Sequence, residues 1–175
     1  MSSSENLQDL HRQQKLYWDQ MFELKVAASY IRQYRDHLGT WVTGLGILKA
    51  VASSAGIAAW VIWKQYAFVW GAIIAASQLV DALKDVFPFA KKHKSASALA
   101  MTLDNLFIDV QLEWEYIFSG KYSDEEMMKR LHQLRKLQLD AEKNNFPDGL
   151  ATREILLDRA KQDAAEYLEN TYGVY

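Results

Sequence analysis

The sequence contains no cysteine, and only two prolines and eight glycines among its 175 residues. The absence of cysteine excludes disulfides, thiolate metal sites and cysteine nucleophiles. So few prolines and glycines argue against a β-sandwich, which needs many tight turns, and favour long helices. Basic and acidic residues nearly balance, 20 against 22, which does not indicate a general affinity for nucleic acid. We therefore predict an all-α protein without a nucleic-acid partner.

Motifs of catalytic or metal chemistry are also lacking. The four histidines are scattered, and the chain has no HExxH, no phosphate-binding glycine loop and no GxSxG. One predicted helix carries a row of acidic residues: Asp104, Asp109, Glu113 and Glu115. We interpret this row as solvated, or paired with Arg12, Lys25 or Arg32 of the first helix, rather than as a metal site. The sequence thus predicts no enzyme, no catalytic residue, no metal and no cofactor.

What the chain does have is a strongly apolar middle. Residues 40–63 carry one charge, Lys49, and residues 66–80 carry none. A helix needs about 20 residues to cross the ~30 Å hydrocarbon layer, and both segments reach that length if their ionisable residues lie near the membrane edge. We predict a two-helix transmembrane hairpin over residues 40–90, with spans of about 40–63 and 66–89. A buried helical hairpin in a water-soluble bundle is the alternative.

Two ionisable residues lie at matching depths in this hairpin. Lys49 precedes Lys64 by fifteen residues and Asp81 follows Gln65 by sixteen, which places both about 22–24 Å from the tip. At such depths a lysine and an aspartate either pair or extend to the nearer interface. Polar groups within a membrane usually face a bundle interior or a water-filled cavity. The candidate residues for a lumen or an inter-helix polar face are Lys49, Ser53, Gly56, Ile74, Gln78 and Asp81.

Aromatic and small residues support the hairpin. Aromatic rings gather at both ends of the spans, where headgroups would lie, and the predicted interface anchors are Trp41, Trp60, Trp63, Tyr66 and Trp70. Small residues at four-residue spacing, as in the pair Gly71 and Ala75, permit close approach of helices in a membrane. We expect the same close packing to explain Gly44 and Gly46.

Positive charge predicts the orientation of the hairpin. Basic residues flank the ends of the spans that lead to the two termini, whereas the tip carries only Lys64. Because basic flanks stay on the cytoplasmic side, we predict a multi-pass membrane protein with both termini in the cytoplasm. Three lysines after the second span are candidate contacts for anionic lipid headgroups, or an ordinary stop-transfer flank: Lys91, Lys92 and Lys94.

The flanking segments have the pattern of amphipathic helices. Leucines and other apolar residues recur every seven positions between Leu10 and Leu38, and Gly39 is the predicted helix stop. Further helices are expected in 91–143, with a break near Gly120 and a capping box from Ser123 to Glu126. A turn at 144–149 precedes a last helix, within residues 144–175. We expect these long terminal helices to pack as a bundle or a coiled coil.

The layout of the chain resembles a known family. A helix up to residue 39, a two-helix hairpin with a short tip and a helical C-terminal region are similar to the SLATT domain. The resemblance covers most of residues 10–145 and is carried by Trp18-Asp19 through Tyr34-Arg35 and by Trp41 to Trp63. That family comprises bacterial two-transmembrane effectors of nucleotide-sensing conflict and anti-phage systems. The resemblance implies an effector that forms a pore or disrupts the bacterial inner membrane.

Function is predicted from these patterns together. One hairpin has too few helices to enclose an aqueous path, so a pore requires several copies of the chain. We expect the partners to be the lipid bilayer, further copies of the chain and an upstream sensor protein that supplies the trigger. The alternatives are a non-conducting membrane adaptor that recruits a partner through its cytosolic helices, and a soluble helical-bundle interaction protein.

Overall fold

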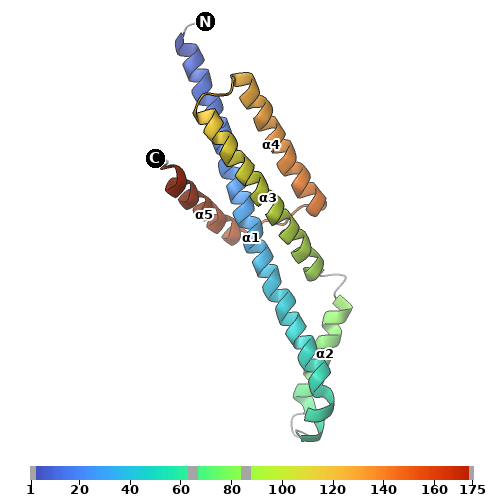
Figure 1. The fold of residues 1–175 in the computed structure, drawn as a ribbon. Helices are drawn as coiled ribbons and strands as arrows, with labels where there is room; N and C mark the ends of the chain where they lie inside the picture. Colours follow the sequence, from blue (N-terminus) through green and yellow to red (C-terminus); the bar gives the residue numbers. More distant parts are fainter. Residues whose placement is uncertain (1–2, 63–66, 84–87, 174–175) are drawn as a thin grey trace. The chain divides into compact units, whose positions relative to one another are not determined.

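The computed structural model describes residues 3–62, 67–83 and 88–173, with side chains from residue 11 to 50, from 68 to 82 apart from Trp70, and from 88 to 173. Five helices follow one another along the chain: α1 (Ser3–Ile62), α2 (Ala67–Leu83), α3 (Phe89–Phe118), α4 (Asp124–Asn145) and α5 (Glu154–Tyr172) (Figure 1). The described ranges contain no strand. The predicted all-α class is therefore confirmed.

The chain divides into two compact units. The first, called here the bundle unit, consists of Met1–Tyr34 and Ser95–Tyr175. The second, called here the hairpin unit, is Arg35–Lys94. Both α1 and α3 contribute residues to each unit.

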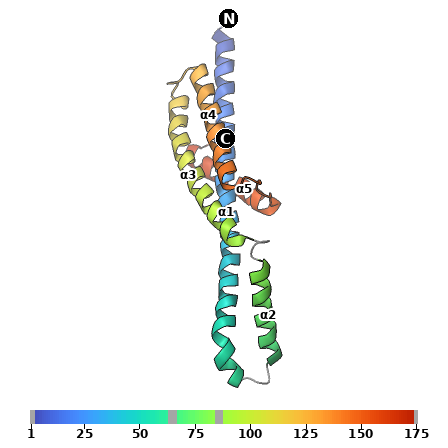
Figure 2. The same ribbon diagram turned by 90° about the vertical axis from the view of Figure 1, so that its right-hand side faces the viewer.

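The core of the bundle unit is made by one face of each of its helices. The seven-residue repeat of α1 supplies Tyr17, Leu24 and Ile31, all fully or almost fully buried. Burial of a large apolar side chain contributes about 1.5–3 kcal/mol, so these positions hold α1 against its neighbours. The other helices contribute the remaining core residues, which include Leu99, Leu103, Val110, Ile117, Met127, Leu131, Leu134, Ala160, Ala164 and Leu168. Of the two packings expected for these helices, the structure has the bundle (Figures 1 and 2).

The end of α3 and the start of α4 lie where the local sequence predicts them. Gly120, with φ of +70°, adopts the left-handed conformation directly after α3, which costs glycine little because it has no side chain. The Ser123 hydroxyl accepts from the backbone N–H of Glu126, and the Glu126 carboxylate accepts from the backbone N–H of Ser123. The predicted break and the predicted capping box are both confirmed.

One predicted boundary, the helix stop at Gly39, is wrong, and another lies one residue inside the next helix. α1 does not end at Gly39 but continues to Ile62. Glycine at position 39 instead leaves room for a neighbouring side chain, because a Cβ there would lie 3.3 Å from Nε2 of His93. The second expected span, 66–89, includes Phe89, which the structure assigns to the start of α3. Pro88 accounts for this change, since proline is tolerated just before or within the first turn of a helix and disrupts its interior.

In the hairpin unit, α2 lies beside the C-terminal part of α1 (Figure 2). Apolar residues dominate α2 and the part of α1 that lies in this unit, and small residues such as Ala75 and Ala76 stand among bulky ones. Across the portion of the chain that the structure describes, no helix combines the length and the apolar character needed to cross a bilayer.

Candidate functional site

The hairpin unit buries little of its surface, and large apolar side chains of both its helices are exposed. Among the described residues of 40–50 and 68–82, the one buried residue is Ser77, whose exposed fraction is 8%. Large apolar side chains on the same helices face outward, with exposed fractions of 88% for Phe68, 60% for Ile47 and 59% for Leu79. A monomeric water-soluble protein rarely exposes so many neighbouring apolar groups. This outer surface is suited to an apolar environment.

An ion pair joins the two helices of the hairpin. The Lys49 ammonium donates a hydrogen bond to Oδ1 of Asp81, 32 residues further along the chain. Of the two arrangements expected for these residues, pairing and extension to the nearer interface, the structure has the pairing. Each side chain remains about half exposed, at 43% for Lys49 and 50% for Asp81. A polar spot therefore interrupts the apolar surface of the hairpin.

The remaining predicted site residues divide into described and undescribed positions. On α2, Ile74 and Gln78 are exposed near Asp81, so this face of the helix mixes polar and apolar groups. The side chains of the other candidates lie outside the described residues: Ser53, Gly56, Trp60, Trp63, Tyr66 and Trp70.

The aromatic anchor Trp41 is held in place by a second ring. It stacks on Phe89 with ring centroids 6.0 Å apart and an interplanar angle of 16°, while about half of its surface stays exposed. Such a stack contributes about 0.5–1.5 kcal/mol beyond the burial of its area. This contact ties α1 to the start of α3, near the two sequence ends of the hairpin unit.

The three lysines near this end lie on the first turns of α3. Lys91, Lys92 and Lys94 are all exposed, and His93 between them is half-buried against Gly39. The lysines are thus positioned to contact anions in solvent or at a surface.

Close helix packing does not explain the glycines of the hairpin. A Cβ built at Gly44, Gly46 or Gly71 would meet no described atom within 4 Å. These glycines face open space rather than the partner helix, so the predicted close packing is wrong for the contacts made within one described chain.

In the bundle unit the acidic row of α3 forms ion pairs with other helices. The Asp104 carboxylate accepts two hydrogen bonds from Arg32, and Glu113 accepts one from Tyr17 and one from Arg130. The described residues hold no group of three metal-ligating side chains. The pairing of the row with α1 was expected for Arg32, whereas the Arg130 pair was missed because no helical spacing links α3 with α4.

Helix α5 is attached through contacts that sequence patterns did not predict. The Lys25 ammonium lies 3.5 Å from the ring centroid of Tyr167, and burial, followed by the charge of Arg32, lowers the Lys25 pKa. The Tyr30 hydroxyl donates to the carbonyl of Ala151 and accepts from the backbone N–H of Arg153, both at 3.1 Å. Tyr30 therefore fixes the loop that leads into α5.

Comparison with known proteins adds no relative. No protein-family model, no curated protein and no solved structure matches the chain.

Proposed function

We propose that the protein is an oligomeric membrane effector whose hairpin unit enters a bilayer and whose copies together make that bilayer permeable. The observation that carries the proposal is the exposure of large apolar side chains on both helices of the hairpin. In a bilayer the lipid tails would cover Phe68, Ile47 and Leu79, which water surrounds unfavourably. The proposed spans, 40–63 and 66–89, include positions outside the described residues.

The Lys49–Asp81 pair supports assembly of several copies. A charged side chain in contact with hydrocarbon is costly, by up to about 2.5–3.5 kcal/mol at the bilayer centre and by less toward its edge, where this pair would lie. The cost is removed when the pair faces another copy or a water-filled path. Gln78 lies one turn before Asp81 on α2 and extends the same polar stripe. This stripe is our candidate lining of the path.

A second apolar stripe supports contacts between copies outside the membrane. Met101, Ile108 and Leu112 are all more than half exposed. Their spacing of seven and four residues places them on one side of α3, opposite the face that carries Leu103 and Val110 in the core. A helix with two apolar faces can bury the second one against another copy.

The basic residues fit a negatively charged leaflet. Lys91, Lys92 and Lys94 are exposed beside the end of the hairpin, and each lysine near such a surface contributes about 1 kcal/mol. Because basic flanks stay on the cytoplasmic side of a membrane, both termini lie in the cytoplasm in this proposal. The resemblance to the SLATT domain adds the bacterial inner membrane, a role in defence and a sensor protein as the trigger.

Membrane extraction and mass measurement test the first step of the proposal. We expect the full chain to stay with the membrane pellet in alkaline carbonate and to have the mass of several copies in detergent. Ile108→Glu should lower that mass, whereas Gln133→Glu, which adds the same charge at an exposed position of α4, should not. A chain that is released into carbonate as a water-soluble monomer contradicts the proposal.

Dye release from liposomes tests permeation. The protein should release a small anionic dye, and Lys49→Leu or Gln78→Leu should change the rate or the charge selectivity of release. Lys161→Leu, an exposed lysine on α5, is the matched control and should release dye as the unchanged protein does. Inserted oligomers that leave liposomes sealed would favour the adaptor alternative, in which the α3 stripe binds a partner protein.

A further inference from the structure

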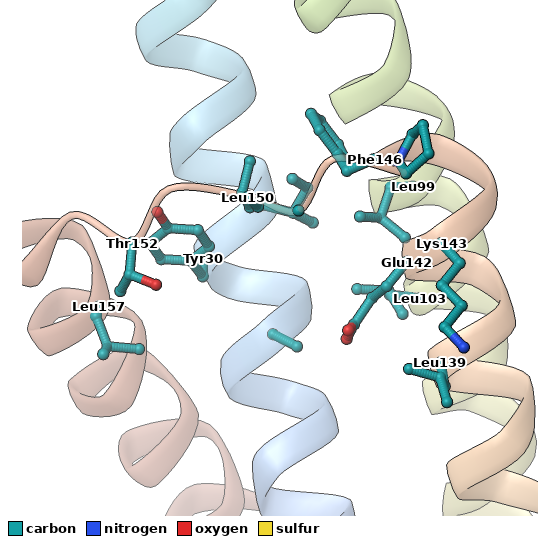
Figure 3. A pocket seen from close by; sticks show the side chains of 14 residues that line it. Tyr30, Leu99, Leu103, Leu139, Glu142, Lys143, Phe146, Leu150, Thr152 and Leu157 are labelled. Carbon is teal, nitrogen blue, oxygen red and sulfur yellow. The ribbon is translucent and has the colours of Figure 1, made fainter.

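A pocket of about 460 Å³ lies within the bundle unit, where α1, α3, α4 and the loop before α5 meet. Its walls are mainly apolar and include Ile31, Leu99, Leu103, Leu139, Phe146 and Leu157 (Figure 3). Side chains from four helices and from the connecting loop thus surround one space.

The size and the lining of this pocket are those of a small-molecule site. Pockets for small ligands have volumes of about 300–1,000 Å³ and are mostly apolar, with a few polar groups that fix orientation. The pocket opens to solvent, since Leu139, Lys143 and Thr152 of its lining are exposed, and an apolar ligand would replace the water that covers its apolar walls. An apolar body of the size of a phenyl ring with a short chain fits these walls.

One acidic side chain supplies the polar group. Glu142 lines the pocket from the last turn of α4, and one of its carboxylate oxygens accepts from Nε2 of Gln138 at 3.0 Å. Figure 3 shows its carboxylate directed into the space beside Leu103. Among the ion pairs between described residues, none includes Glu142. Lys143, also in the lining, is exposed to solvent.

Other polar groups of the lining are occupied or peripheral. The Tyr30 hydroxyl already has both a donor and an acceptor in the loop, so that its ring rather than its oxygen faces a ligand. Thr152 is exposed at the edge of the pocket. Of the two charged side chains in the lining, Glu142 is half-buried and Lys143 is exposed, so the carboxylate is the charged group that an occupant of the pocket would meet inside it.

We propose that this pocket binds a small amphipathic amine, with its apolar body against Leu99, Leu103 and Phe146 and its ammonium group at Glu142. The inference is independent of the membrane proposal, since every residue involved lies in the bundle unit. Binding links α4 to Leu157 at the start of α5. An occupied pocket thus holds α5 more firmly against the other helices.

Three probes of similar shape and different charge test the site. Calorimetric titration of the purified full chain at pH 7 uses 4-phenylbutylamine, 4-phenylbutan-1-ol and 4-phenylbutanoate, with the probe's heat in protein-free buffer or detergent subtracted. We expect the amine to bind about fivefold more tightly than the alcohol and the carboxylate to bind least, since a partly exposed ion pair contributes up to about 1 kcal/mol. Equal affinities for the amine and the carboxylate, or no binding of any probe, overturn the proposal.

Two substitutions locate the binding. Glu142→Gln keeps the shape of the side chain, so the amine should bind as weakly as the alcohol while the alcohol is unaffected. Asp140→Asn, an exposed change outside the pocket on the same helix, should alter neither. Ala27→Leu narrows the pocket from α1 and should weaken the binding of both probes. Unchanged amine binding in Glu142→Gln, or unchanged binding of both probes in a folded Ala27→Leu variant, contradicts the proposal.

Discussion

The Tyr17 hydroxyl donates a hydrogen bond of 2.7 Å to Oε2 of Glu113, whose other oxygen accepts from Nη1 of Arg130. These contacts connect α1, α3 and α4 at a point where the Tyr17 ring is fully buried. The Arg130 guanidinium also lies 4.1 Å from the ring centroid of Tyr122. A polar connection of this kind fixes which residues of the three helices lie opposite one another, which apolar packing alone specifies less strictly.

Removing the Tyr17 hydroxyl should therefore destabilise the bundle unit. Tyr17→Phe keeps the ring and deletes one hydrogen bond to a charged acceptor, so we expect the free energy of unfolding to fall by about 1.5–3 kcal/mol. Urea unfolding followed by circular dichroism measures the change. Tyr116→Phe on α3 is the matched control, because the Tyr116 ring packs against Tyr122 and Lys121 and its hydroxyl makes no hydrogen bond to another described residue. Equal losses in the two variants would show that the hydrogen bond is not responsible.

The same residue predicts a loss of stability in alkali. Burial, then the hydrogen bond and the negative charge of Glu113, raise the Tyr17 pKa above its ordinary value of 10.0, while Arg130 acts in the opposite direction and Tyr122 adds to the rise. Above pH 10 the unfolded chain ionises this tyrosine and the folded chain keeps its proton. The contribution to stability is thus present below pH 10 and falls by about 1.4 kcal/mol per pH unit above it.

Unfolding measured between pH 9.5 and 11 checks this dependence. The free energy of unfolding should decline more steeply in the unchanged protein than in Tyr17→Phe. Parallel declines in the two proteins would contradict it.

Tyr30 should control the exchange of amide protons at the start of α5. Tyr30→Phe removes the acceptor of the Arg153 N–H and the donor to the Ala151 carbonyl. Because each hydrogen bond contributes about 1 kcal/mol, we expect the amides at the beginning of α5 to exchange about fivefold to thirtyfold faster. Hydrogen exchange followed by mass spectrometry resolves this segment. Tyr34→Phe, one turn later on α1, should leave exchange there close to that of the unchanged protein.

Gly39 and His93 should be energetically coupled. Alanine within a helix is about 1 kcal/mol more favourable than glycine, but a Cβ at position 39 would press on the His93 ring at 3.3 Å. We expect Gly39→Ala to stabilise a His93→Ala background by about 1 kcal/mol and the unchanged protein by less. A double-mutant cycle measures the difference. Zero coupling would mean that the ring moves aside freely.

Local patterns predicted much of the bundle. The seven-residue repeat of α1 predicted the burial of Tyr17, Leu24 and Ile31. The break at Gly120 and the cap at Ser123 follow from the backbone chemistry of a few neighbouring residues. Each of these features depends on residues that are close together in the sequence, so the sequence alone is enough to predict it.

Features that join distant segments were not predictable in the same way. Gly39 is a residue type that often ends a helix, yet it lies inside α1, and its neighbour in space is His93, 54 positions later. The pocket needs four helices and a loop to meet before it exists. The Lys49–Asp81 pair was predictable in part. The two residues lie at equal distances from the turn, which places them at the same depth, but this spacing does not decide whether they pair or extend to an interface.

The division of the bundle unit into Met1–Tyr34 and Ser95–Tyr175 sets an order for biosynthesis. A ribosome makes residues 35–94 before any of the helices that pack against the first segment, and the hydrogen bonds of Tyr30 must wait for residues 121 and 123 positions later. Contacts of such long sequence separation form slowly. The hairpin therefore leaves the ribosome while the apolar face of the first segment, with Tyr17, Leu24 and Ile31, still lacks the helices that cover it.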